Sequence, residues 1–260
     1  MRKSVRLLCL IMAFLLCLNM AACGEKPASG NSAGKQIQNQ DSGAQDDVPG
    51  TTQGNDEQST EQNKEPQTPE EFFKNAAFIG DSVTLKLRYY DAANKCLYGA
   101  TFLCQGSYSV AHAVNNSMYL SYRGEDITPQ DALKACGADK VFILLGMNDI
   151  ALWGIDKTMD NWATLIANIR NTCPNIEIYI QSGTPIYLDG EVGGLTNANM
   201  DAYNQRLQAF AQEQGCYYVD VNTPFRNSSG GLAEAYCSDS FVHFTDAACK
   251  LWVEILMELV

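Results

Sequence analysis

Apolar runs alternate with segments of helical periodicity through most of this chain, and that alternation is the strongest constraint on its fold. The pattern is typical of a parallel β-sheet that is covered by helices on both faces. We therefore predict an α/β fold with three layers, α/β/α, around a five-stranded parallel sheet. The predicted strands are residues 76–79, 101–104, 140–145, 176–180 and 216–221.

Three of the intervening segments carry apolar side chains at helical spacing. We interpret these stripes as the core-facing sides of helices, and we assign Trp162 and Trp252 to the core rather than to a functional site. The stripes are Met159, Trp162, Ile166 and Ile169, then Met200, Tyr203, Leu207 and Phe210, then Ala248, Leu251, Trp252, Ile255 and Leu259.

Polar residues that follow the predicted strands are the candidates for a functional site. In open α/β sheets, ligands bind beyond the carboxyl ends of the strands. Serine, glycine, asparagine and histidine from four unlike segments are expected on that rim. The segments are Gly80-Asp81-Ser82, Gln105-Gly106-Ser107, Gly146-Met147-Asn148-Asp149 and the stretch 238–243, which ends at His243.

Ser82 follows the apolar residues Phe78 and Ile79 and precedes a predicted helix, so it is expected at a strand-to-helix turn. At a helix N-terminus, unpaired backbone N–H groups and the helix dipole stabilise a developing negative charge. A serine nucleophile and its oxyanion require such a position. A serine that merely caps the helix would show the same local pattern, so the assignment depends on the other three segments.

These segments, in this order, resemble the four sequence blocks of the GDSL/SGNH hydrolase family over residues 72–260. The resemblance implies a flavodoxin-like fold and ester hydrolysis without metal or cofactor. Ser82 is then the nucleophile and His243 the base. The oxyanion hole is then formed by the backbone N–H groups of Ser82 and Gly106 and the side chain of Asn148.

Each of these roles has an alternative. Gly106 satisfies the pattern equally as a turn glycine, and Asn148 as a cap after a strand. His112, the other histidine of the chain, has no acidic neighbour in its apolar segment, so His243 is the predicted base. Asp81 and Asp149 are predicted to order their loops rather than to transfer protons.

Asp239 is the predicted orienting acid, although its spacing departs from the family pattern. The family aspartate stands three residues before the histidine, where this chain has Ser240, whereas Asp239 stands four before His243. An irregular loop absorbs an extra residue by a tighter turn, which lets a carboxylate accept the Nδ1 hydrogen bond. The alternative is a Ser82–His243 dyad oriented by a backbone carbonyl, with Asp239 capping a turn.

The connection at residues 183–194 is long and rich in glycine, which suits a lid or a wall of the substrate site. Tyr108, Trp153 and Tyr187 are candidates to line the site, and an aromatic lining would suit a sugar ring. Ordinary packing beneath loops explains the same aromatic residues equally well.

The first residues of the chain have the features of an export signal. In residues 1–22, basic residues precede an apolar core that is too short to span a bilayer. Residues 20–23 resemble a bacterial lipobox, with Met20 in place of the usual leucine, which implies that Cys23 is lipidated. Ordinary signal cleavage beside a coincidental cysteine is the alternative. We expect an exported lipoprotein on the extracellular side of the cell membrane.

The remaining chain divides into a tether and one domain. Residues 23–67 are polar with almost no apolar side chains, so we predict a disordered tether. Residues 68–260 form the predicted hydrolase domain, which begins with the helix-capping sequence Thr68-Pro69-Glu70-Glu71.

Charge and cysteine usage exclude two classes of function. The formal net charge of -12 and the lack of a basic stripe argue against nucleic-acid binding. The domain contains seven cysteines but no Cys-x-x-Cys pair, so a zinc site is not expected. We interpret several of these cysteines as small core residues and leave a disulfide among the others open.

The function predicted from the sequence is that of a surface-anchored serine esterase. It removes acetyl or other short acyl groups, with a polysaccharide or cell-wall glycan as the expected ester substrate. The alternatives are an esterase or acyltransferase for lipids or small esters, and a non-catalytic wall-binding lipoprotein with the same fold. The presence of Ser82, Asn148 and His243 together argues against the last, because binding alone does not require all three.

Overall fold

The computed structural model describes residues 67–260. The predicted signal peptide at 1–22, Cys23 and all of the tether except its last residue lie outside the described residues. Within the described part, no helix combines the length and the apolar character that crossing a membrane requires.

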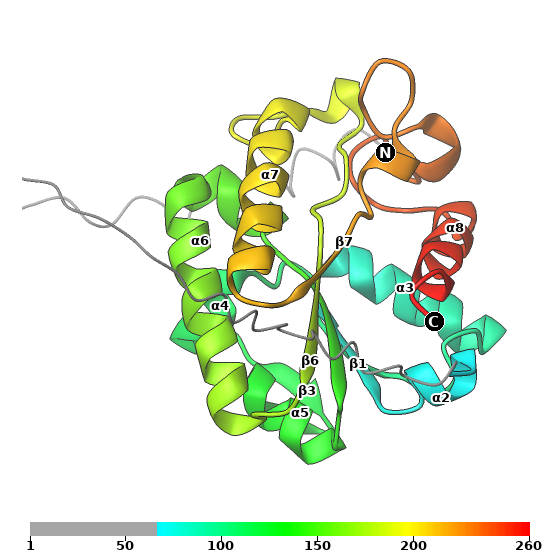
Figure 1. The fold of residues 1–260 in the computed structure, drawn as a ribbon. Coiled ribbons are helices and arrows are strands. Elements are labelled where there is room, and N and C mark those ends of the chain that lie inside the picture. The colour runs from blue at the N-terminus through cyan, green and yellow to red at the C-terminus, as the bar shows by residue number, and fades with distance from the viewer. Residues whose placement is uncertain (1–66) are drawn as a thin grey trace, which may run out of the picture. The chain divides into compact units, whose positions relative to one another are not determined.

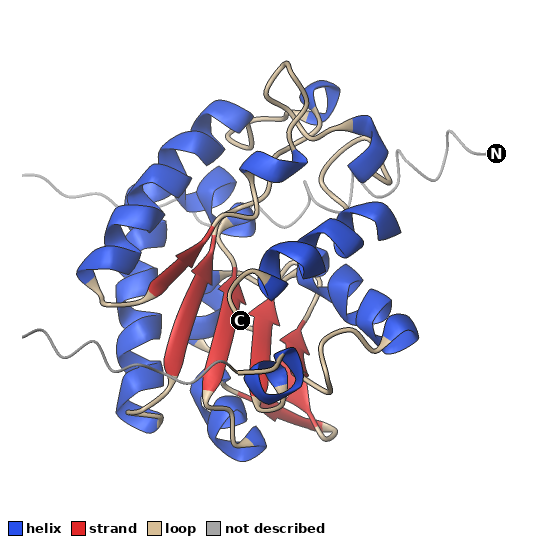
Figure 2. Ribbon diagram, turned by 45° about the vertical axis from the view of Figure 1, so that its right-hand side comes forward, coloured by secondary structure: helices blue, strands red, loops and turns tan. Residues whose placement is uncertain are grey.

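A five-stranded parallel sheet forms the centre of the fold, which confirms the architecture predicted from the apolar runs. The strands lie in the order β2-β1-β5-β6-β7. Every neighbouring pair is parallel, so all five carboxyl ends meet at one edge (Figure 2). Their bounds are β1 (Ala76–Gly80), β2 (Thr101–Cys104), β5 (Lys140–Leu144), β6 (Glu177–Gln181) and β7 (Tyr217–Val219).

The strand order reverses between β1 and β5. From β1 the chain continues to β2 on one side, and it then returns to β5 on the other side. Loops leaving two such strands diverge to opposite sides of the sheet, which opens a crevice for ligands at this point. The residues that follow β1 and β5 therefore lie at this crevice.

Helices cover both faces of the sheet (Figure 1). One apolar core includes side chains of α4, α5, α6 and α7, and the other includes side chains of α2, α3 and α8. Alternate strand residues point to opposite cores, as Ile79 and Phe78 of β1 do. The helices are α2 (Pro69–Phe73), α3 (Ser82–Asn94), α4 (Val110–Asn115), α5 (Pro129–Cys136), α6 (Met147–Thr172), α7 (Asn197–Glu213) and α8 (Asp246–Met257), with 3₁₀ turns η1 (Leu188–Gly190), η2 (Thr223–Phe225) and η3 (Glu234–Tyr236).

The predicted apolar stripes of α6 and α7 are buried throughout. Helix α8 buries Ala248 and Trp252 as predicted, together with Cys249 and Leu256. The other predicted members of its stripe are only partly buried, at the margin of the same core. The capping box at Thr68 is also present, with Glu71 Oε2 accepting from Thr68 N at 2.9 Å.

A small antiparallel hairpin was not predicted. It consists of β3 (Leu120–Tyr122) and β4 (Glu125–Ile127), and its turn at Arg123 and Gly124 has positive φ angles of 54° and 85°. Strands of three residues are too short to show the alternation by which a strand is recognised in sequence.

Candidate active site

Ser82 is the first residue of α3, directly beyond the end of β1. Asp81 caps this helix, because its Oδ1 accepts a hydrogen bond of 2.9 Å from Val83 N. The turn is tight, since a Cβ at Gly80 would lie 1.9 Å from Thr84 Oγ1. Ser82 therefore lies in the first helical turn, where backbone N–H groups lack intrahelical partners.

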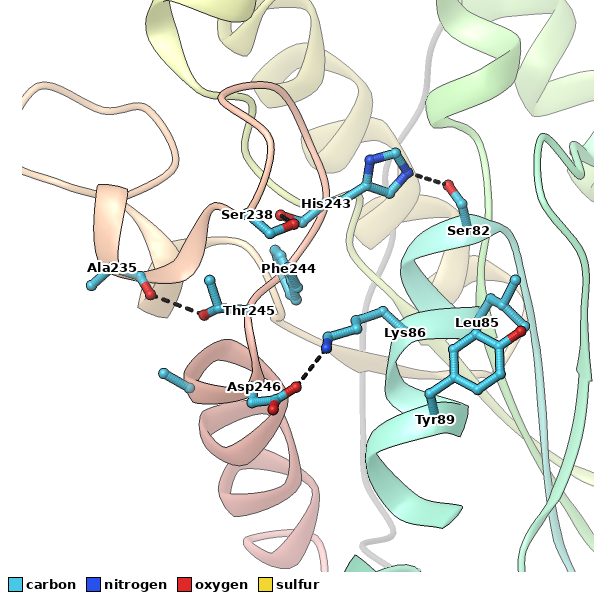
Figure 3. Close-up of a pocket in the computed structure, with 11 residues that line it drawn as sticks. Ser82, Leu85, Lys86, Tyr89, Ala235, Ser238, His243, Phe244, Thr245 and Asp246 are labelled. Atoms are coloured by element: carbon cyan, nitrogen blue, oxygen red, sulfur yellow. Dashed lines mark hydrogen bonds and ion pairs between the residues drawn. The ribbon is translucent and has the colours of Figure 1, made fainter. Parts of the chain in front are cut away.

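His243 lies between Ser82 and Asp239. Its Nε2 is 3.0 Å from Ser82 Oγ (Figure 3), and its Nδ1 is 2.6 Å from Asp239 Oδ2. When Nδ1 donates to the carboxylate, Nε2 is free to accept the proton of the serine hydroxyl. The three side chains thus have the mutual geometry of a nucleophile, its base and an orienting acid.

The loop that carries His243 is shaped by Asp239. The Oδ1 of Asp239 accepts hydrogen bonds from the backbone N of Phe241, Val242 and His243 at 2.9, 3.1 and 3.2 Å. Ser240 has a φ of 59°, and this left-handed turn accommodates the extra residue between the acid and the histidine. Burial acts to raise the pKa of Asp239, but the hydrogen bonds from His243 and the backbone lower it overall.

Asn148 lies in the first turn of α6, beyond the end of β5. Its Nδ2 donates two hydrogen bonds of 3.1 Å, one to Asp81 Oδ2 and one to Tyr108 O. Asp81 therefore connects the turn that carries Ser82 to the amide of Asn148. This connection joins the two strand ends at the reversal of the sheet.

Two buried carboxylates order the loops around this site. Burial raises the pKa of Asp81 from 3.8 to about 6, opposed by the Val83 N hydrogen bond and by His243. Asp149 accepts hydrogen bonds of 2.9 Å from the backbone N of Val110 and Ala111 at the start of α4. Burial raises the pKa of Asp149 as well, against these two bonds.

The turn before Asn148 relies on a close contact that sequence reasoning missed. Gly146 has a φ of 111°, and a Cβ there would lie 2.1 Å from Tyr203 Oη. This hydroxyl donates to Leu145 O and accepts from Trp162 Nε1, both at 2.8 Å. Tyr203 and Trp162 were predicted only as core residues. The hydroxyl and indole N–H within their apolar stripes were the available signal, because such groups need hydrogen-bond partners when they are buried.

Gly106 lies in the exposed turn that follows β2. A Cβ at this position would meet no atom within 4 Å, and its φ lies outside the positive range that favours glycine. Neither a special backbone conformation nor a close protein contact therefore explains a glycine here. The space beside its backbone is open.

Two clefts that share no lining residue adjoin the site. The α3 cleft, about 690 Å³, is lined by residues that include Ser82, Lys86, Tyr89, His243 and Asp246 (Figure 3). The α6 cleft, about 360 Å³, is lined by residues that include Ser107, His112, Asn148 and Trp153. The first cleft contacts the nucleophile and the base, and the second contacts a predicted oxyanion donor. Lys86, Tyr89 and Asp246 were not among the site residues predicted from the sequence.

The aromatic residues proposed to line the site have different surroundings. Trp153 is 59% exposed and lines the α6 cleft. For Tyr108 the packing alternative holds, because its side chain is fully buried and does not line either cleft; its carbonyl accepts a hydrogen bond from Asn148. Tyr187 packs, partly buried, against the core on the α3 side of the sheet.

The connection at residues 183–194 is tied to the rest of the fold. Asn197 Nδ2 donates to both Ile186 O and Glu191 Oε1, at 2.8 Å each. Tyr187 N donates to Phe241 O at 2.8 Å. The connection therefore braces the loop that carries His243, rather than standing as a free lid.

Among residues 67–260, no group of three or more His, Cys, Asp or Glu side chains is arranged to hold a metal ion. The seven cysteines of this part of the chain are free thiols. Six of them are partly buried, and Cys249 is fully buried.

A serine, a histidine and a carboxylate at the carboxyl edge of a parallel α/β sheet define a serine hydrolase. The chain belongs to the GDSL-like Lipase/Acylhydrolase family, whose model matches residues 78–251. The sequence-based assignments to this family, to its fold and to the serine ester hydrolases are thereby confirmed. A comparison with curated protein sequences gives no match.

Solved structures show the same fold at low sequence identity. A GDSL-like lipase from Bacteroides thetaiotaomicron is 16% identical, with a TM-score of 0.56 and coverage of 71% of this chain and 86% of that one. An acetyl xylan esterase is 16% identical, with a TM-score of 0.54 and coverage of 71% and 98%. A carbohydrate esterase family 3 protein from Talaromyces cellulolyticus is 14% identical, with a TM-score of 0.51 and coverage of 71% and 94%.

Proposed function

We propose that this serine esterase removes short acyl groups, chiefly acetyl, from carbohydrate through an acyl-enzyme on Ser82. The observation that carries the proposal is the relay in which Ser82 Oγ lies 3.0 Å from His243 Nε2. The same imidazole contacts Asp239 Oδ2 at 2.6 Å through its other nitrogen. A serine hydroxyl is a weak nucleophile by itself, and a base oriented in this way activates it.

The reaction proceeds in two halves. In the first, Ser82 Oγ attacks the ester carbonyl while its proton moves to His243 Nε2, and Nε2 then returns that proton to the departing alcohol. In the second, water gives a proton to Nε2 and attacks the acyl-serine. Nε2 then returns that proton to Ser82 Oγ as the carboxylic acid leaves, which restores both side chains. Asp239 holds the ring and stabilises its positive charge in both halves.

The oxyanion of each tetrahedral intermediate needs donors arranged in advance. We assign this role to the backbone N–H groups of Ser82 and Gly106 and to Asn148 Nδ2. The open space beside Gly106 supports its assignment. Both hydrogens of Asn148 Nδ2 already have protein acceptors, so one of them must be shared with the oxyanion.

Acetylated carbohydrate is proposed as the substrate class on two grounds. Proteins of the same fold include an acetyl xylan esterase and a carbohydrate esterase family 3 protein, and a shared fold supports this class without establishing it. The lipobox-like segment before Cys23 would hold the enzyme at the cell surface, within reach of polysaccharides whose hydroxyl groups carry acetyl esters. The polar tether would let the domain reach them.

The test measures acyl preference and substrate class with the full chain. We expect acetyl release from acetylated xylotetraose, and we expect p-nitrophenyl acetate to be hydrolysed faster than the octanoate. Ser82→Ala is the control for both assays. A preference for long acyl chains, with no release of acetate from the saccharide, would assign the enzyme to lipids.

A further inference from the structure

We propose that the α3 cleft is the subsite for the alcohol part of the ester, and that it takes an uncharged oligosaccharide whose sugar ring packs on Tyr89. This inference rests on the proposed esterase function and deepens it. Two features of the cleft are the exposed ring of Tyr89 on α3 and the ion pair that joins Lys86 of α3 to Asp246 of α8 (Figure 3). Neither feature is used in the chemistry of bond cleavage.

The position of the cleft identifies the part of the substrate that enters it. The departing alcohol must lie beside His243 Nε2, which supplies its proton, whereas the carbonyl oxygen must point toward the oxyanion donors. The α3 cleft is lined by Ser82 and His243 but by neither Gly106 nor Asn148. The α6 cleft has the opposite composition, with Asn148 and without Ser82 or His243. The alcohol is therefore assigned to the α3 cleft.

One face of α3 forms a wall that runs away from the nucleophile. Lys86 and Tyr89 follow Ser82 by four and seven residues, so all three lie on the same side of the helix. Seven residues extend about 10 Å along a helix axis. Tyr89 is 61% exposed, and an exposed ring at this distance suits a neighbouring sugar of a chain whose acylated unit lies at Ser82.

The ion pair indicates a polar and uncharged occupant. Lys86 Nζ contacts Asp246 Oδ1, so the two charges compensate each other in the lining of the cleft. The pair offers both donors and acceptors, which hydroxyl groups satisfy in either direction. An aliphatic chain would remove the pair from water without replacing its hydrogen bonds, at a net cost. Beside this pair, sugar hydroxyls are therefore favoured over a lipid tail, and the apolar side chains of Leu85 and Phe244 that also line the cleft leave room for the carbon face of a sugar ring.

The test uses two series of esters that vary the alcohol and the acyl group independently. One series keeps the acetyl group and varies the alcohol from ethyl acetate to acetylated xylotetraose. The other series keeps ethanol and lengthens the acyl group from acetate to hexanoate. We expect Tyr89→Ala to raise KM for the saccharide about tenfold with kcat within about twofold, because the lost ring contacts the bound sugar and not the reacting atoms. An ethyl group is too short to reach the ring. Both kinetic constants for every ethyl ester should stay unchanged.

Two further variants sharpen the result. Tyr89→Phe keeps the ring and should restore the saccharide KM. Tyr119→Ala removes a tyrosine that is 43% exposed and lines neither cleft, so it should have no effect.

Four outcomes would overturn the inference. An unchanged saccharide KM in Tyr89→Ala would show that the ring does not bind the substrate. A change in kinetic constants confined to the acyl series would show that the cleft binds the acyl chain. Hydrolysis of ethyl acetate but not of the saccharide would reject the substrate class while leaving the esterase intact. If the wild-type protein hydrolyses neither ester, the proposed function fails and this inference fails with it.

Discussion

The imidazole Nδ1 of His243 lies 2.6 Å from Asp239 Oδ2, although Asp239 stands one position farther from the histidine than in the family pattern. The extra residue is Ser240, whose φ of 59° turns the chain back. Asp239 caps this turn with Oδ1 and contacts the imidazole ring with Oδ2. Turn capping and orientation of the histidine were predicted as alternatives, and one carboxylate has the geometry for both.

Asp239→Asn should lower kcat on the order of 10⁴, as the same change does in serine proteases, because the amide favours the wrong imidazole tautomer. Steady-state kinetics on p-nitrophenyl acetate measure the loss. Ser240→Gly is the matched control, since glycine adopts the left-handed backbone without strain, and its kcat should stay within about threefold of wild type. A kcat close to the wild-type value in Asp239→Asn would show that catalysis depends on a Ser82–His243 dyad without an acid.

Asn148→Ala should lower kcat about 10²- to 10³-fold with a smaller effect on KM, the usual result of losing one oxyanion donor. Circular dichroism and thermal unfolding of the variant check that the fold persists. If KM rises while kcat holds, Asn148 binds the substrate in its ground state and the oxyanion assignment is wrong.

Asp81 should make stability depend on pH in a defined direction. Its folded-state pKa of about 6 lies above the ordinary 3.8, so between these values the folded state holds more protons than the unfolded state. Stability associated with this group is therefore present at low pH and lost as the pH rises through about 6. The loss is on the order of 3 kcal/mol at most.

Urea unfolding of wild type and Asp81→Asn at pH 4.5 and 7.5 measures this dependence. The asparagine does not titrate, so the free energy of unfolding of the wild type should decrease relative to the variant as the pH rises. A difference between the two proteins that is the same at both pH values would show that Asp81 does not titrate in this range.

The centre of the sheet was predictable because β1 and β5 are short runs that are buried along their whole length and mostly apolar, such as Val141 to Leu144. The three-residue strands of the β3–β4 hairpin lack such a signal. Helix α8 was predicted correctly, but which of its apolar side chains are fully buried depends on its neighbours in space.

The site residues were predictable where they directly follow a strand, because the strand order then determines where they lie on the edge of the sheet. Ser82 and Asn148 follow adjacent strands, β1 and β5, so the topology alone brings them to one crevice. The hydrogen bond between Asn148 and Asp81 and the contact of Tyr203 with the Gly146 turn depend on tertiary distances. Such distances cannot be predicted from the pattern of residue types along the chain.

Cys23 should carry the lipid that anchors the enzyme. When the full chain is produced in a bacterial host that processes lipoproteins, we expect it to partition into detergent and to begin at a diacylated Cys23. Intact-mass analysis measures the modification, and Cys23→Ser should move the protein to the aqueous phase. An unmodified Cys23, or cleavage at another residue, would contradict the anchor.

The central claim is that Ser82 forms the covalent intermediate. The most direct measurement is to label the full chain with a fluorophosphonate and to locate the adduct by peptide mass spectrometry. We predict a single adduct on Ser82, with esterase activity lost in proportion to labelling and with neither labelling nor activity in a folded Ser82→Ala protein. An adduct on another residue, or a Ser82→Ala protein that still hydrolyses esters at the wild-type rate, would contradict the account.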